Sequence, residues 1–438
     1  MDLNYSQYKK YHESFMQNNH GSTALHTFLC IFFTLLCALF CAIRQEKHNT
    51  VKYIREYFII ILPLILAHTV LSNYIVELNI GILIFLLYEI AKNQNFLNVK
   101  KTLETKNVFE NDKIQSITCL RGLTYLITGL CILAVDFADF PRHLAKTENY
   151  GYSLMDTGVG LFILISGFVH KNINKSNYRS VIKGNAKFVL ILLLLGVGRY
   201  FSVKQLDYQE HVTEYGVHWN FFFTLAICKF VSTILLLVSN NGLVLSVVVI
   251  SIHEFVLYVG LQSWVFSNEP RKTIVEANRE GISSSLGYIA LYLFAASLKQ
   301  VLNNRTVTRY CILRKLILRF IVLFIISLII NTYRPISRTL ANAGYCGYLC
   351  TVVVFGITIM YLLEINFDNG KFEVPLTLQA INNNGLVYFL LCNLSTGVIN
   401  LSFRTLLVPS VVTFVILNFH MIVTIILTIY FSNKGIRI

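Results

Sequence analysis

The chain has 438 residues, of which 55% are hydrophobic and only 14% charged, and its mean hydropathy is +0.59. This composition excludes an ordinary soluble domain and indicates an integral membrane protein. The formal net charge of +14 could suggest a nucleic-acid partner. Because Lys and Arg fall in short loops between apolar runs, as is usual in membrane proteins, we expect no nucleic-acid binding.

Apolar runs long enough to cross a bilayer follow one another along the chain. They are predicted near 21–43, 57–72, 74–91, 118–135, 154–170, 184–201, 220–238, 243–263, 286–302, 313–332, 344–364, 384–401 and 406–431. Since backbone groups find no water in the hydrocarbon core, these runs must be helices. The sequence predicts an all-α polytopic membrane protein with about 13 transmembrane helices in a single domain, 1–438. The pattern is weakest at 286–302 and at the Asn73 break.

The distribution of basic residues orients the predicted spans. Lys and Arg are more frequent in every second loop, for example 92–113 and 171–183, and these loops are expected in the cytosol. The N-terminus is then lumenal and the C-terminus cytosolic, in agreement with a glycosylation sequon at Asn4. The loops 136–153 and 202–219 fall together on the lumenal side.

The ten cysteines lie mostly inside apolar runs, where they resemble small buried hydrophobic residues more than a disulfide framework. Cys346 and Cys350 are one helical turn apart, but no further Cys or His completes a zinc set. We therefore expect no structural metal.

The loop 136–153 could bring an acid and an amine together. Asp136 follows an apolar run, Pro141 prevents that run from continuing as a helix, and Lys146 lies on the returning segment. In a partly dry pocket the two could act as general base and electrostatic stabiliser, since burial raises the pKa of an aspartate while a neighbouring lysine opposes the rise. An interfacial ion pair that fixes the loop is the alternative.

In the loop 202–219, four ionisable residues are spaced as one stripe of a helix: Asp207, His211, Glu214 and His218. Such a stripe could bind a polyhydroxylated or amino-bearing head group, or relay protons. Metal binding is not favoured, because HExxH is missing and Gly216 weakens the helix. A solvated segment on the membrane surface is the alternative, and the aromatic run 219–223 is typical of a membrane interface.

Together the two loops resemble a known family. The stretches DFADFPRHLAKTE (136–148), SLMDTGVG (153–160) and DYQEHVTEYGVHWNFFFT (207–224) are similar to those of the GPI-anchor inositol acyltransferases, the PIG-W family. The likeness covers the whole chain. It implies a multi-pass enzyme of the endoplasmic reticulum membrane in GPI-anchor biosynthesis. Such an enzyme moves a fatty acyl chain, usually palmitoyl, from acyl-CoA to the 2-hydroxyl of inositol in glucosaminyl-phosphatidylinositol.

The resemblance also implies roles for single residues. An aspartate and a lysine ten residues apart are that family's proposed catalytic pair, and they correspond to Asp136 and Lys146 here. We hypothesise that Asp136 takes the inositol proton, that Lys146 stabilises the oxyanion or holds Asp136, and that no acyl-enzyme forms. The expected substrate-binding residues are Arg142, for a phosphate, and Asp207, Glu210, His211, Glu214, His218, Trp219 and Asn220.

One departure from the family pattern is visible. The family usually has Arg-Arg after the proline, whereas this chain has Arg142-His143, which leaves the second basic position without an assigned role. His143 and Glu148 are spaced one residue differently from the H-x4-D of glycerolipid acyltransferases. Nothing elsewhere in the chain supports that second resemblance.

Acyl-CoA is the expected co-substrate, with no bound cofactor. Because CoA is made in the cytosol, the thioester must reach the predicted lumenal site through the bundle, or the topology is shifted by one span. The basic loop 171–183 could attract CoA phosphates, although positive-inside charge explains it equally well. Two other functions remain open: another polytopic membrane O-acyltransferase, and a proton-coupled transporter, which would predict inverted repeats.

Overall fold

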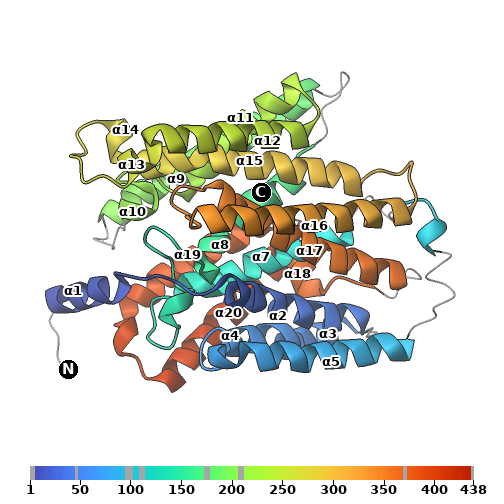
Figure 1. The fold of residues 1–438 in the computed structure, drawn as a ribbon. Coiled ribbons are helices and arrows are strands. Elements are labelled where there is room, and N and C mark those ends of the chain that lie inside the picture. Colours follow the sequence, from blue (N-terminus) through green and yellow to red (C-terminus); the bar gives the residue numbers. More distant parts are fainter. Residues whose placement is uncertain are drawn as a thin grey trace.

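The computed structural model describes residues 5–44, 48–93, 102–107, 114–171, 178–205, 212–367 and 372–435. Over these residues the regular structure is helical, with two isolated bridges and no strand. The predicted all-α architecture is confirmed (Figure 1).

The helices of the first half are α1 (Tyr5–Met16), α2 (Ala24–Ile43), α3 (Asn49–Glu56), α4 (Leu62–Ala67), α5 (Ile75–Asn93), α7 (Gln115–Ala134), α8 (Leu154–Phe168), α9 (Tyr178–Gln205) and α10 (Val212–Tyr215). Those of the second half are α11 (Phe221–Val238), α12 (Gly242–Val256), α13 (Gln262–Val265), α14 (Ile274–Ala277), α15 (Arg279–Leu302), α16 (Arg309–Tyr333), α17 (Ala343–Asn366), α18 (Leu376–Asn383), α19 (Gly385–Ser402) and α20 (Ser410–Asn433). Short turns of other helix types are η1 (Tyr57–Ile61), η2 (Ser72–Tyr74), η4 (Arg142–Leu144), η5 (Leu257–Leu261) and η6 (Thr405–Leu407).

Each predicted apolar run coincides with a helical segment, but the count of 13 spans is not confirmed. Ten helices of the described residues are long and apolar enough to cross a membrane. The run at 57–72 is shorter than predicted. It begins with the π-helical turn η1 and continues as α4, which contains Pro63 and ends at Ala67. The run at 154–170 forms the 15-residue α8, and α16 covers 313–332 but is not among the ten.

Helix α15, which shares the lowest hydropathy of the ten candidate spans with α19, is the most buried of them. It packs against α8, α11 and α12 in the middle of the bundle. Its Ser, Gly and Ala residues lower its hydropathy, but they also let neighbouring backbones approach closely. Gly167 of α8 illustrates this, since a Cβ there would lie 2.5 Å from the Tyr292 carbonyl oxygen of α15.

The bundle has two distinct ends (Figure 1). The α1 end is formed by residues 5–23, 135–153, 212–220 and 334–342. Backbone bonds such as Gly151 N–H to the Ile336 carbonyl join the first, second and fourth of these segments, and Glu214 of 212–220 pairs with Lys146. At the opposite end, the segment 102–107 pairs with Thr308, and the Asn107 amide donates to the Leu302 carbonyl. The loop 136–153 and the described part of the loop 202–219 therefore lie at one end, as the sequence predicts.

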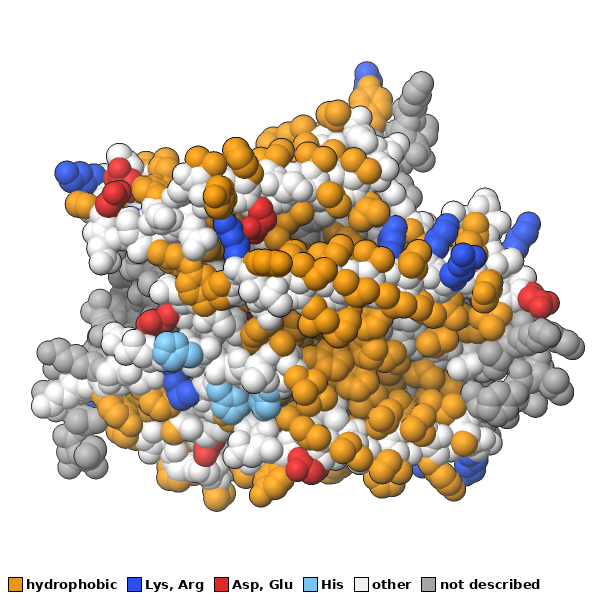
Figure 2. All heavy atoms as spheres, in the orientation of Figure 1, with side chains coloured by type: hydrophobic (Ala, Val, Ile, Leu, Met, Phe, Trp, Pro, Cys, Tyr) orange, Lys and Arg blue, Asp and Glu red, His pale blue; other side chains and the backbone are white. Residues whose placement is uncertain are grey.

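Apolar side chains cover much of the outer face. In Figure 2 they form a continuous area over the middle of the bundle, and Lys and Arg gather towards the right, where the opposite end lies. The outward residues of α5, α9, α12 and α16 include many exposed aliphatic side chains. Exposed apolar area on this scale fits contact with lipid.

Candidate active site

A cavity connects the polar α1 end with the apolar interior. Its volume is about 790 Å³, and α2, α7, α8, α9, α11, α17 and α19 contribute to its walls. Along α7 its lining extends from Leu120 to Ile132 and on to Val135 and Asp136, and the helical part of this path measures about 18 Å at 1.5 Å per residue. The cavity is therefore long enough for an extended fatty acyl chain with its reactive end at the polar mouth.

Asp136 lies at the mouth, two residues after the end of α7. It is only 4% exposed, and its Oδ2 accepts a 2.7 Å hydrogen bond from the Asn400 amide of α19. The His12 Nε2 of α1 lies 3.9 Å from the other carboxylate oxygen. Three elements that are far apart in the sequence thus position this carboxylate.

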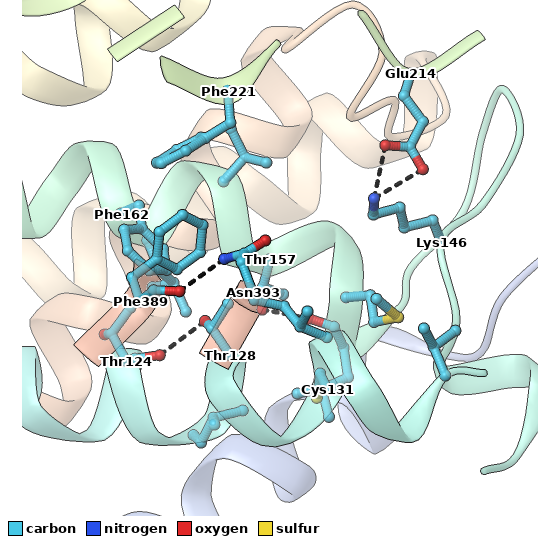
Figure 3. A pocket seen from close by; sticks show the side chains of 18 of the residues that line it. Thr124, Thr128, Cys131, Lys146, Thr157, Phe162, Glu214, Phe221, Phe389 and Asn393 are labelled. Carbon is cyan, nitrogen blue, oxygen red and sulfur yellow. Dashed lines mark hydrogen bonds and ion pairs between the residues drawn. The ribbon is translucent and has the colours of Figure 1, made fainter. Parts of the chain in front are cut away.

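Lys146 lies in the same cavity and pairs with Glu214 of α10. Its Nζ donates to both Glu214 oxygens, at 2.7 and 2.6 Å (Figure 3). Both side chains are partly exposed. The ion pair links the two loops that the sequence singled out, although the partner of Lys146 is Glu214 and not the Asp136 carboxylate that the sequence suggested.

The backbone around Lys146 is held by a buried ion pair. Asp156, in the first turn of α8, accepts hydrogen bonds from the backbone and hydroxyl of Thr147 and a 2.8 Å bond from Arg338 Nε. The Asn19 amide in turn donates to the Lys146 carbonyl at 2.9 Å. Burial alone would lower the pKa of the Arg338 guanidinium, but the carboxylates of Asp156 and Glu214 keep it above its ordinary value. The cation therefore stays charged and orders this loop.

Arg142 also lines the cavity, from the short turn η4. Its guanidinium carbon lies 4.9 Å from the centre of the Phe15 ring, and burial lowers its pKa. The next residue, His143, packs edge-on against His26, and burial followed by the His26 charge lowers its pKa. Glu148 accepts the backbone N–H of Asn18. His143 and Glu148 therefore contact different residues, His26 and Asn18.

The second loop is only partly as predicted. Helix α10 ends at Tyr215, and Gly216 has a φ of +105° and touches Asn278, so the polar stripe does not continue as one helix to His218. Asp207, Glu210 and His211 lie outside the described residues. Glu214 and His218 both line the cavity.

Trp219 and Asn220 line the cavity too, but their polar atoms form hydrogen bonds within the protein. The Trp219 indole N–H donates to Thr224 at 2.9 Å, and its ring lies against Gly281. The Asn220 oxygen accepts the N–H groups of Phe222 and Phe223 as the N-cap of α11, while its amide donates to the Gly196 carbonyl. Their substrate-binding role stays a prediction.

An aromatic cluster lines the inner part of the cavity. Phe162, Phe221 and Phe389 contact one another with ring centres 5.1 to 5.5 Å apart (Figure 3). Figure 3 places these rings on the side of the cavity away from Lys146 and Glu214. The site therefore has a charged mouth and an apolar inner part, which suits a lipid-like ligand with a polar head.

The comparisons with known proteins agree with this arrangement. The profile of the GWT1 family matches residues 8–431, nearly the whole chain. The chain belongs to the GWT1 family. The family resemblance that the sequence motifs suggested is thereby confirmed.

Full-length relatives of this GWT1-family chain have descriptive names. GPI-anchored wall transfer protein 1 of Schizosaccharomyces pombe is 32% identical, over 98% of this chain and 99% of the relative. Glucosaminyl-phosphatidylinositol-acyltransferase PIGW of Bos taurus is 30% identical and that of Homo sapiens 28%, each over 98% of this chain and 99% of the relative.

Several site residues of this GWT1-family member were not singled out from the sequence. Arg338 and His12 come from segments without a motif, and their proximity to Asp156 and Asp136 depends on the fold. Asn400 and Asp156 are polar residues in apolar helices, for which helix–helix hydrogen bonds are the common role. Their position beside Asp136 and Lys146 follows from tertiary packing.

Proposed function

We propose that this GWT1-family protein is an acyl-CoA-dependent O-acyltransferase that acylates the inositol of glucosaminyl-phosphatidylinositol in GPI-anchor biosynthesis. The observation that carries the proposal is the long cavity with Asp136 and Lys146 at its polar mouth. The names of the full-length relatives support the acceptor and the reaction class. Palmitoyl-CoA is the proposed donor, and the proposed location is the endoplasmic reticulum membrane.

In this reaction Asp136 acts as general base on the inositol 2-hydroxyl. The hydroxyl oxygen attacks the thioester carbonyl, the tetrahedral oxyanion collapses, and the C–S bond breaks to release CoA, whose thiolate takes up the proton. The Asn400 hydrogen bond and the nearby His12 hold the Asp136 carboxylate in place. Transfer is direct, without an acyl-enzyme.

Lys146 stabilises the oxyanion in this proposal. A lysine ammonium has three N–H donors, so contact with Glu214 leaves donor capacity for the developing charge. Glu214 keeps the flexible side chain at the mouth before substrate binds. In the same proposal Arg142 contacts a phosphate of the substrate, and Glu214 and His218 contact the glucosamine and inositol.

The test is acyl transfer in microsomes from labelled palmitoyl-CoA to glucosaminyl-phosphatidylinositol. We expect wild type to acylate inositol, Asp136→Asn to lose activity by about 10²- to 10⁴-fold, and Lys146→Ala by about 10²- to 10³-fold, at equal protein levels. Asp139→Asn is the matched control, because Asp139 is three residues away and bonds to Ser410 outside the cavity lining. Full activity of Asp136→Asn would refute the base assignment.

A further inference from the structure

Three basic side chains lie near the inner part of the cavity. Arg121 is on α7, Lys229 on α11 and Lys299 on α15, and each of the three helices is a candidate membrane span. Measured at 1.5 Å per residue from the opposite end of its helix, Lys299 lies about 5 Å deep, Arg121 about 9 Å and Lys229 about 14 Å. The three cations therefore follow a path from the opposite end towards the middle of the bundle.

The three cations repel one another, and no carboxylate of the described residues pairs with them. Lys229 experiences the charges of Arg121 and Lys299, and Lys299 also that of Lys171. Within the described part of the chain, no carboxylate forms an ion pair with Arg121, Lys229 or Lys299. Unpaired cations in a membrane-embedded bundle are costly, which makes a functional role the first hypothesis.

Lys229 has little to compensate for its burial. It is 7% exposed, and its Nζ lies over the rings of Phe188 and Tyr292, at 5.0 and 6.0 Å from their centres. Such rings attract a cation but do not neutralise it. Lys299 differs, since its Nζ donates to the His170 carbonyl at 2.7 Å.

Unsatisfied polar atoms surround the same cluster. Arg121 Nε is buried and has no hydrogen-bond partner in the described structure, and neither has the oxygen or the nitrogen of the Asn384 amide. Tyr125 connects the two, because it interacts with Arg121 and its ring lies against Gly385, next to Asn384 at the break between α18 and α19. Two of these atoms, Arg121 Nε and the Asn384 amide nitrogen, are buried donors that an acceptor-rich group can satisfy.

The cluster adjoins the acyl cavity. Tyr125 packs edge-on against Phe162 with ring centres 4.9 Å apart, and Phe162 belongs to the aromatic cluster in the inner part of the cavity. For an acyl-CoA with its phosphates at Arg121 and Lys229 and its thioester at the mouth, the pantetheine arm would thus run along the cavity beside the acyl chain.

We infer that Arg121, Lys229 and Lys299 form a binding site for the phosphates of the CoA moiety of the acyl donor, which arrives from the opposite end of the bundle. This inference rests on the proposed acyl-CoA-dependent function. The site would lie on a route through the bundle for a thioester that reacts at the α1 end. Phosphate groups are the ligand chemistry that guanidinium and ammonium groups bind best.

The test is binding of labelled CoA to the purified full-length protein, which requires no turnover. We expect Arg121→Gln and Lys229→Gln each to weaken CoA binding at least tenfold, and Lys229→Arg to retain most of it. Lys434→Gln is the matched control, an exposed cation at the C-terminal end of α20. Thermal unfolding of every variant shows whether the fold is intact.

A phosphate-free thioester, palmitoyl-N-acetylcysteamine, separates the phosphate site from the acyl site. The KM of the variants should rise for palmitoyl-CoA and stay unchanged for this donor. If folded wild type and variants bind CoA equally well, the inference is wrong. It is also wrong if wild type binds phosphatidic acid at the cluster but does not bind CoA. If CoA binds as expected but no acyl transfer to inositol occurs, the proposed function fails and the phosphate site stands.

Discussion

At the scale of single residues, the two proposed catalytic side chains are each positioned by a neighbouring side chain. Asp136 is oriented by Asn400, and Lys146 by Glu214. A carboxylate that accepts a hydrogen bond is stabilised in its charged form. Removing the donor should therefore change how the base titrates as well as how fast it reacts.

Asn400→Ala should lower acyl transfer about tenfold, the equivalent of one hydrogen bond to a charged group. Loss of the donor disfavours the charged Asp136, so its pKa rises and the acid limb of the kcat/KM profile moves to higher pH. Asn418→Ala is a suitable comparison, because Asn418 lies outside the cavity lining and its amide donates within its own helix to the Phe414 carbonyl. An unshifted acid limb in Asn400→Ala would argue against a positioning role.

The buried ion pair between Asp156 and Arg338 should stabilise the fold. Asp156→Asn or Arg338→Met alone leaves one buried charge without its partner and should lower the free energy of unfolding by about 3–5 kcal/mol. The double variant should lose less than the sum of the two, because neither charge remains unpaired. The measurement is thermal or detergent unfolding, and additive losses would show that the two side chains are not coupled.

At the scale of elements, α8 forms both the anchor of the Lys146 loop and a wall of the acyl cavity. Its first turn contains Asp156, and two residues later Gly158 lines the cavity. A Cβ at Gly158 would meet no atom within 4 Å. A larger side chain could therefore enter the cavity without disturbing the helix.

Gly158→Phe should shorten the acyl chain that the protein accepts. Transfer from palmitoyl-CoA should fall at least tenfold, while transfer from octanoyl-CoA is largely retained, because the ring takes up space needed by the longer chain. Gly184→Phe is the control, since Gly184 also has open space around it but lies on α9 outside the cavity lining. Equal loss with both donors would mean that Gly158 does not border the acyl chain.

At the scale of the whole molecule, the two ends of the bundle differ in kind. The α1 end contains the candidate site, and the excess of basic residues in the loops of the opposite end predicts a cytosolic location for it. The proposed route of the acyl donor requires this orientation.

Engineered glycosylation sites test the orientation in microsomes. With Asn4→Gln as background, a sequon placed in the exposed segment 268–272, at the α1 end, should be glycosylated, because that segment would be lumenal. A sequon in 303–306, at the opposite end, should remain unmodified. The reverse pattern would place the candidate site in the cytosol and remove the need for a route through the bundle.

The sequence by itself determined the helical bundle, the two site loops and the family, because hydropathy and contiguous motifs such as 207–224 are local properties. Tertiary structure decided that Lys146 pairs with Glu214, that Arg338 joins Asp156, and that α15 is the buried centre. These depend on contacts between residues up to 182 positions apart, which no local pattern records. Likewise, only the tertiary structure brings the cations of α7, α11 and α15 near one another beside the acyl cavity.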